Sequence, residues 1–222
     1  MKKKVVALMA GVMVMLTMNA MASSLKVGTS YSYPIYVLNG NTPVAEGAGS
    51  FDTSYLDERK LDYLYCVDLT HFITPGGTYS YSTENNTANI HNSTLTNAGK
   101  VAYLLGAYGA GGQGANAQAL QAAIWYEISN GVYKLDQTMY TGSNSNVATL
   151  YNQYVNAADT HPLGDVSKFV WINPGTDVNG TALYQAQVTS GHAPEPSTIV
   201  LLVTGMLGMA VFGKRRMIKT AQ

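Results

Sequence analysis

Hydrophobic and polar positions alternate over short stretches of the N-terminal half of the chain, which is typical of β-strands. A first strand is predicted over residues 26–38, and Pro34 demotes its middle to an edge strand or a bulge, because proline has no N–H to donate. Further strands are predicted over residues 61–69 and 78–82. Turns or loops are predicted over residues 39–41, 75–77 and 85–93.

In the centre of the chain the hydrophobic spacing changes to three and four residues. This spacing predicts helices over residues 97–108, 116–130 and 144–159. Thr96 and Asn116 are the expected N-caps of the first two helices, and Asn130-Gly131 ends the second. A glycine-rich linker, Gly109 to Gly114, is expected between these two helices.

The pattern returns to strands over residues 166–172 and 182–188, with a turn at residues 173–175. Strands followed by helices and then strands predict an α+β domain over residues 23–190. We expect a β-sandwich or barrel-like sheet with a helical insertion. Residues 1–22 and 191–222 differ in character and read as targeting segments.

Composition narrows the classes of function. Charged residues make up 12% of the 222 residues and the formal net charge is zero, which argues against a nucleic-acid-binding protein, since such a protein needs a basic surface. The 16 tyrosines, four phenylalanines and two tryptophans argue against a disordered chain. Low charge with many Tyr, Thr, Asn, Ser and Gly residues is typical of a secreted β-rich domain.

The N-terminus has the three parts of a secretory signal peptide. Lys2, Lys3 and Lys4 are followed by an apolar run from Val5 to about Met18. The small residues of Ala20-Met21-Ala22 predict cleavage after Ala22, so we expect an exported protein.

The C-terminus holds a short apolar segment, Ile199 to Phe212, followed by the basic residues Lys214, Arg215, Arg216 and Lys219. At about 1.5 Å per residue the segment is shorter than the hydrocarbon core of a bilayer, roughly 30 Å. The basic flank predicts a cytoplasmic C-terminus. On these features alone the segment is a short membrane anchor.

Pro194-Glu195-Pro196 stands immediately before this apolar segment. The succession of this motif, a short helix and a basic tail resembles the PEP-CTERM sorting signal, over Pro194 to about Lys219. The resemblance implies processing near the motif by an exosortase, a membrane transpeptidase of exopolysaccharide-producing Gram-negative bacteria. It also implies transient anchoring in the inner membrane, and a final place at the cell surface or in the extracellular matrix.

Several familiar motifs lack the context that they need. The GxGxxG pattern of residues 109–114 follows a predicted helix instead of a strand and is read as a linker. The histidines show no metal-ligand spacing with one another or with the cysteine and are expected at the surface: His71, His91, His161 and His192. Asp57 and Glu58 are read as solvated charges. No metal or cofactor is expected, and a cysteine hydrolase using His71 or His91 has no local support.

Cys66 is the single cysteine of this exported chain, so it cannot form an intramolecular disulfide. It is buried, paired with another chain, or used chemically. In the predicted strand of residues 61–69, alternation places Cys66 opposite the continuous apolar face of Tyr63, Tyr65 and Val67. We therefore expect a second layer, such as the helical insertion, to cover Cys66.

Gln121 is a polar residue within an apolar helix face. At helical spacing it shares that face with Ala117, Ile124, Trp125 and Ile128. An unpaired buried amide costs about 1–3 kcal/mol. The simplest expectation is a hydrogen bond from Gln121 to a backbone group.

Cys66 and Gln121 also have a joint chemical interpretation. A thiolate can attack the side-chain amide carbon of glutamine and expel ammonia, leaving an internal thioester. Close contact within a fold would supply the effective concentration, and burial would protect the product from water.

Two motifs, Tyr65-Cys66-Val67-Asp68-Leu69 and Leu120-Gln121-Ala122-Ala123-Ile124-Trp125, resemble those of the thioester domain of bacterial surface adhesins (the TQXA-like Cys/Gln domain). The similarity extends over roughly residues 60–131. It implies a thioester-domain-like fold and a cross-link between Cys66 and Gln121. The chain has Leu120 where the family often has Thr, and the family comes mainly from Gram-positive surfaces.

We therefore expect an exported protein whose Cys66–Gln121 thioester attaches it covalently to an amine-bearing surface or matrix molecule, in a single event without enzymatic turnover. The alternative is a non-covalent structural protein associated with exopolysaccharide in a biofilm matrix, with an inert buried cysteine.

Overall fold

The structure is a computed structural model of the chain, and it describes residues 23–30, 34–47, 51–111, 114–177 and 181–191. The predicted signal peptide, residues 1–22, and the predicted sorting signal from Pro194 to Lys219 lie outside the described residues and stay predictions. Within the described part of the chain, no helix combines the length and the apolar character that crossing a membrane requires.

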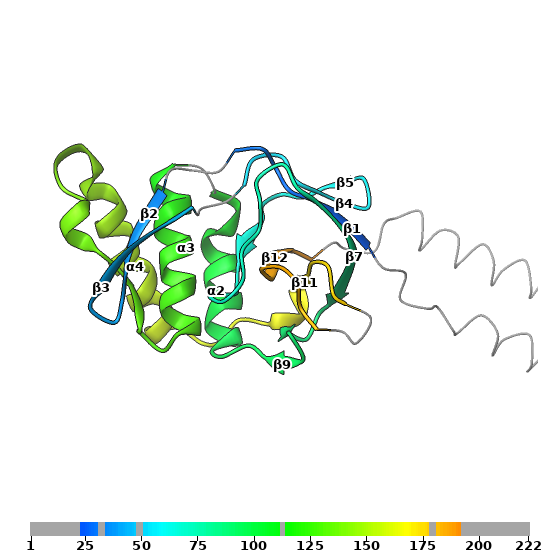
Figure 1. The fold of residues 1–222 in the computed structure, drawn as a ribbon. Coiled ribbons are helices and arrows are strands. Elements are labelled where there is room, and N and C mark those ends of the chain that lie inside the picture. The colour runs from blue at the N-terminus through cyan, green and yellow to red at the C-terminus, as the bar shows by residue number, and fades with distance from the viewer. Residues whose placement is uncertain (1–22, 31–33, 48–50, 112–113, 178–180, 192–222) are drawn as a thin grey trace, which may run out of the picture. The chain divides into compact units, whose positions relative to one another are not determined.

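A curled antiparallel sheet of seven strands forms one side of the fold (Figure 1). Its strands, in spatial order, are β5 (Arg59–Lys60), β4 (Tyr55–Leu56), β1 (Ser23–Lys26), β7 (Thr78–Asn85), β11 (Phe169–Asn173), β12 (Gln187–Ser190) and β6 (Tyr65–Cys66). The long strand β7 pairs with β1 on one side and with β11 on the other. The site strand β6 ends the sheet and pairs with β12.

Two smaller sheets complete the β structure. One has three strands in the order β10 (Tyr133–Leu135), β2 (Pro34–Asn39) and β3 (Thr42–Gly47). The other is a hairpin of β8 (Asn89–Ile90) and β9 (Ser93–Thr94), which overlaps residues 85–93, predicted as a loop. Strand β10 was not predicted from the sequence.

Three helices pack against one another beside the curled sheet (Figure 1). They are α2 (Ala98–Tyr108), α3 (Ala115–Ile128) and α4 (Ser145–Thr160), and all three predicted helices are confirmed to within two residues. Short 3₁₀ turns lie at η1 (Gly109–Gly111), η2 (Gln137–Met139), η3 (Gly142–Asn144) and η4 (Val166–Lys168). The turn η1 confirms that the GxGxxG segment connects two helices.

Both predicted N-caps are wrong. Asn97, in the left-handed region at φ 53°, precedes α2 in place of Thr96, and its side chain instead donates to Glu127 O at 2.8 Å. Gly114 precedes α3, and Asn116 lies inside the helix, where its Oδ1 accepts a hydrogen bond from the Tyr154 hydroxyl. Both asparagines thus make tertiary hydrogen bonds rather than local caps.

The helix α3 ends as the sequence predicts. Asn130 and Gly131 have φ of 51° and 79°, and Gly131 N donates to Tyr126 O at 2.8 Å. Left-handed residues of this kind satisfy the last carbonyls of a helix and turn the chain away from its axis.

Several strand predictions need correction. Residues 26–38 are not one strand: they contribute β1 to the large sheet and β2 to the three-stranded sheet. Pro34 begins β2, and at its position β2 pairs with β3 only, so its missing N–H leaves no gap in the ladder. The strand predicted over residues 166–172 is confirmed as β11 but begins later, at Phe169. Of the strand predicted over residues 182–188, only residues 187–188 lie in β12, which continues to Ser190.

The segment of residues 61–69 forms strand pairs only at Tyr65 and Cys66. Its side chains divide between two hydrophobic clusters, because helices and sheet cover it from different sides. Leu61 and Leu64 join the smaller cluster with Leu25 and Leu56, while Tyr63, Tyr65, Cys66 and Val67 join the larger one with the helices. The prediction that Cys66 lies on the opposite side from Tyr63, Tyr65 and Val67 is therefore wrong, because all four belong to one cluster. The prediction that a helix covers Cys66 is confirmed, and that helix is α3.

At the level of fold class, the chain is a mixed α and β protein with a curled antiparallel sheet and a group of helices, as the sequence predicts.

Candidate functional site: a buried cysteine and glutamine

Cys66 lies on β6, the edge strand of the large sheet, and its backbone N–H and C=O point away from the neighbouring strand β12. Its neighbour Val67 donates its N–H to Ala186 O at 3.0 Å, on the side of β12. Successive residues of a strand direct their backbone groups to opposite sides. The N–H and C=O of Cys66 therefore point outward, toward α3.

The side chain of Gln121 occupies this outer edge. Cys66 N donates to Gln121 Oε1 at 2.9 Å, and Gln121 Nε2 donates to Cys66 O at 2.8 Å. The amide thus pairs with Cys66 as a further strand would. Gln121 is fully buried, and the expectation that a backbone group satisfies it is confirmed. That backbone group belongs to Cys66.

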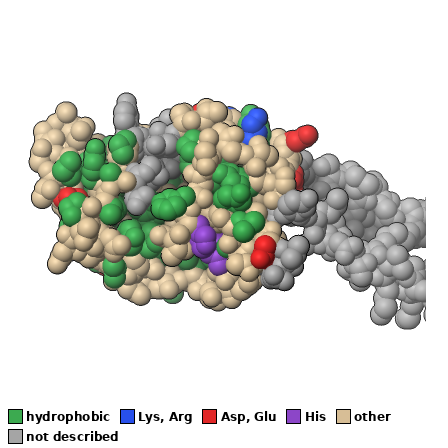
Figure 2. All heavy atoms as spheres, in the orientation of Figure 1, with side chains coloured by type: hydrophobic (Ala, Val, Ile, Leu, Met, Phe, Trp, Pro, Cys, Tyr) green, Lys and Arg blue, Asp and Glu red, His purple; other side chains and the backbone are tan. Residues whose placement is uncertain are grey.

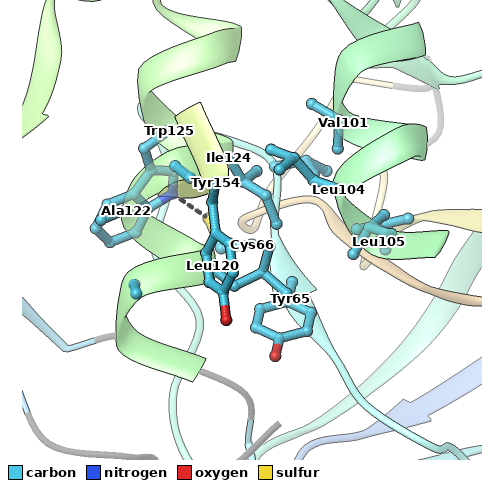
Figure 3. Close-up of a cluster of buried hydrophobic side chains, with 14 of the residues drawn as sticks. Tyr65, Cys66, Val101, Leu104, Leu105, Leu120, Ala122, Ile124, Trp125 and Tyr154 are labelled. Atoms are coloured by element: carbon cyan, nitrogen blue, oxygen red, sulfur yellow. Dashed lines mark hydrogen bonds between the residues drawn. The ribbon is translucent and has the colours of Figure 1, made fainter. Parts of the chain in front are cut away.

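The sulfur of Cys66 is held by a second set of contacts. Trp125 Nε1 donates to Sγ at 3.4 Å, shown as the dashed line in Figure 3. Asp68 N also donates to Sγ at 3.4 Å, while Sγ donates to Asp68 O at 2.9 Å. Trp125 lies one helical turn after Gln121 on α3, so one face of this helix reaches both the main chain and the sulfur of Cys66.

Cys66 belongs to a cluster of buried hydrophobic side chains, which in Figure 3 includes Tyr65, Leu104, Leu120, Ile124 and Tyr154. Burial raises the pKa of the Tyr65 hydroxyl well above its ordinary value. Cys66 itself is only 5% exposed. The cysteine and the glutamine therefore meet in a low-dielectric environment from which bulk water is largely excluded.

Asp68 is a buried carboxylate beside the cysteine. Its Oδ2 accepts hydrogen bonds from His71 Nδ1 at 2.8 Å and His91 Nε2 at 2.7 Å. Its Oδ1 accepts from Thr70 N at 2.8 Å and from the Thr70 hydroxyl at 2.7 Å. Burial alone would raise the pKa of Asp68, but the hydrogen bonds from His91, Thr70 and His71 outweigh it and lower the pKa to about 2.

The prediction of scattered surface histidines is wrong for two of them. His71 and His91 are partly buried, and their rings lie 4.7 Å apart over one carboxylate. Their spacing in sequence gave no signal of this, because they come from separate loops. His161 is exposed and stacks on Tyr103, with ring centroids 4.9 Å apart, and His192 lies outside the described residues.

The histidines do not serve as a base for the thiol. His91 directs Nε2 to Asp68, and its Nδ1 is buried without a hydrogen-bond partner. His71 directs Nδ1 to the same carboxylate. This arrangement differs from the nucleophile–base hydrogen bond of a cysteine hydrolase.

Asp57 and Glu58 form the exposed two-residue turn between β4 and β5, as expected for solvated charges. They border a surface pocket lined by Ser24, Lys26, Tyr55, Asp57, Glu58 and Thr78. Neither Cys66 nor Gln121 lines this pocket, so it has no part in the site.

A second, shallow pocket leads toward the cysteine. It is lined by Asp68, Leu69, His71, Phe72, Trp125, Tyr133 and Gln185. Asp68 and Trp125 both line this pocket and contact Sγ, so the pocket lies close to the cysteine.

Comparison of the chain with models of known protein families, with curated proteins and with solved structures finds no match.

Proposed function

We propose that the protein is a covalent-capture protein in which Cys66 and Gln121 form an internal thioester. The observation that carries the proposal is the double hydrogen bond between the Gln121 amide and the main chain of Cys66, at 2.9 and 2.8 Å in a buried site. It places the side chain that carries the acyl group against the residue that carries the thiol, although 55 residues separate them in sequence.

The hydrogen bonds favour the bond-forming step. When Sγ attacks Cδ of Gln121, the carbonyl electron pair moves to Oε1, where Cys66 N–H already donates. A donor aimed at a developing oxyanion typically contributes about 3–4 kcal/mol of transition-state stabilisation. As the tetrahedral intermediate collapses, the C–N bond breaks. Nε2 takes up the proton released by the thiol and leaves as ammonia.

The contacts of the sulfur act in opposite directions on its two forms. As a thiol, Sγ donates to Asp68 O at 2.9 Å, and this hydrogen bond must break when the proton leaves. The N–H groups of Trp125 and Asp68 both donate to Sγ, and donors to a charged group stabilise the charged form. A thiolate is the nucleophilic species of cysteine. The same contacts fix the position of the sulfur beside α3.

Burial would then preserve the thioester until a partner arrives. An amine, such as a lysine side chain, would enter from the pocket lined by Asp68 and Trp125. It would attack the carbonyl carbon derived from Gln121, form an amide and restore the Cys66 thiol. The protein would be consumed once per partner, so it would not be an enzyme.

The order of elements supports the likeness to thioester domains. The cysteine lies on a strand and the glutamine on a helix that packs against it, with α2 between them in sequence. Export through residues 1–22 and exosortase processing at Pro194-Glu195-Pro196 would place the protein at the surface or in the matrix of a Gram-negative bacterium.

Intact-protein mass spectrometry tests the thioester. The purified wild-type protein should be lighter than its calculated mass by one ammonia. Cys66→Ser and Gln121→Glu should have their calculated masses, since each removes one reacting group. Gln118→Glu, on the same helix, is the matched control and should still show the loss. A wild-type protein at its calculated mass, with no such loss, would refute the proposal.

The alternative is a non-covalent protein of the exopolysaccharide matrix. It is supported by the same amide, because both polar atoms of Gln121 are satisfied without any reaction. Thiol alkylation separates the two functions. An inert Cys66 becomes alkylatable on unfolding alone, whereas a thioester must first be opened with an amine or hydroxylamine.

A further inference from the structure

We propose that Asp68, His71 and His91 bind a divalent transition-metal ion, with Zn²⁺ as the best-suited example. Their candidate ligand atoms all lie within 4.8 Å of one another. They come from the loop after β6 and from the turn between β8 and β9, which the fold brings together. The proposal does not depend on the thioester.

The geometry requires little movement to accept an ion. His71 Nδ1 and His91 Nε2 both point at Asp68 Oδ2, from 2.8 and 2.7 Å. Ligand atoms around a tetrahedral zinc, with bonds of about 2.0–2.1 Å, lie about 3.3 Å apart. Small rotations of the two rings would open this space. On binding, the proton on each of these nitrogens would move to the other nitrogen of its ring, and the lone pair would face the ion.

The carboxylate ligand is held in place by neighbours that an ion would not displace. Thr70 donates both its N–H and its hydroxyl to Asp68 Oδ1, and Ala186 N donates a longer hydrogen bond, 3.4 Å, to Oδ2, the oxygen that would face the ion. Supporting hydrogen bonds of this kind orient metal ligands and commonly contribute 10- to 100-fold in affinity, as a rough range.

His91 is also fixed by its backbone. It has φ of 50° and is followed by Asn92 at 64°, the conformation of a tight two-residue hairpin turn. Its N–H donates to Asn173 Oδ1 at 3.0 Å, which ties the hairpin to β11. Histidine is among the few residues that adopt left-handed backbone with some frequency. The turn therefore positions the ring before any ion binds.

The ligand set selects the kind of ion. Two imidazole nitrogens and one carboxylate oxygen suit zinc and other transition metals, whereas Ca²⁺ and Mg²⁺ prefer oxygen ligands throughout. The Asp68 side chain is 4% exposed, but those of His71 and His91 are 34% and 21% exposed. Histidine side chains reach the surface beside hydrophobic ones on the face drawn in Figure 2. Asp68 and His71 both line a small surface pocket.

Zinc titration of the full chain tests the site. All proteins carry Cys66→Ser, so that the thiol cannot bind metal, and are first treated with a chelator. The parent should compete with a chromogenic chelator for one Zn²⁺ per chain, and its melting temperature should rise with Zn²⁺. His71→Asn and His91→Asn should each lose roughly 100-fold or more in affinity, since loss of a ligand exceeds loss of a supporting bond. His161→Asn is the matched control and should bind as the parent does.

Unchanged zinc affinity in both His71→Asn and His91→Asn would overturn the site. If these variants fail to fold, Co²⁺ binding to the Cys66→Ser parent decides the matter. A visible absorption band from a low-symmetry Co²⁺ site, abolished by added Zn²⁺, supports it. The absence of such a band at saturating Co²⁺ overturns it and leaves the cluster as a hydrogen-bonded network.

Discussion

Replacing Gln121 by methionine should destabilise the protein through the main chain of Cys66. Methionine is close to glutamine in length and shape, so packing against Ile124 and Trp125 is largely retained. Its side chain cannot replace the two hydrogen bonds, however. The N–H and C=O of Cys66 would stay buried at the sheet edge without Gln121 as their partner.

The magnitude follows from these two groups. A buried polar group that loses its partner costs about 1–3 kcal/mol, so the pair costs about 2–6 kcal/mol. Typical domains have a free energy of unfolding of about 5–15 kcal/mol, so the loss is a large share of the total. Cys66→Ala should cost much less, because it leaves the main chain of Cys66 and its bonds to Gln121 in place.

The assay is urea denaturation followed by circular dichroism, with linear extrapolation to water. The comparison is made between Cys66→Ala and Cys66→Ala/Gln121→Met, since neither protein can form a thioester. Gln118→Met in the same background is the control. The Gln118 Nε2 group donates to Pro34 O at 3.3 Å, longer than either bond of Gln121, and Gln118→Met should cost less. A double variant within about 0.5 kcal/mol of Cys66→Ala would refute the role assigned to the amide.

Three further predictions concern the surroundings of the site. Trp125→Phe removes the N–H donor to Sγ. A hydrogen bond to a charged group contributes about 1.5–3 kcal/mol, so the refolded variant should release ammonia roughly 10- to 100-fold more slowly than wild type, as followed by intact-protein mass. An unchanged rate would contradict this. Leu104→Ala should lower the free energy of unfolding by about 2–5 kcal/mol, because Leu104 is fully buried, while the exposed Leu163→Ala should change it little. Burial raises the pKa of Glu127 in the folded chain above its ordinary value. The folded chain therefore binds the proton of Glu127 more tightly than the unfolded chain does. As the pH rises from below the unfolded-state pKa to above the folded-state pKa, the contribution of Glu127 to stability falls. The stability of Glu127→Gln relative to wild type should therefore increase with pH across the mildly acidic range, and a flat difference would contradict the assignment.

The amino-acid pattern alone was enough to predict the three helices and to single out Cys66 and Gln121 as candidate site residues. Apolar residues at three- and four-residue spacing predict α2, α3 and α4. In α2 and α4 this spacing corresponds to one buried face, whereas α3 is buried on nearly all sides from Ala117 to Trp125. The same spacing placed Gln121 on a buried face. The count of one cysteine marked Cys66 before any contact was known.

Which residues come into contact depends on the tertiary structure. Residues 26–38 alternate as one strand but serve two sheets, because pairing depends on partners elsewhere in the chain. Gln121 contacts Cys66 across 55 residues, and His91 contacts Asp68 across 23. The local pattern of hydrophobic positions tells which side of an element is buried. It carries no information on which distant residue covers it, and that choice depends on the packing of the whole fold.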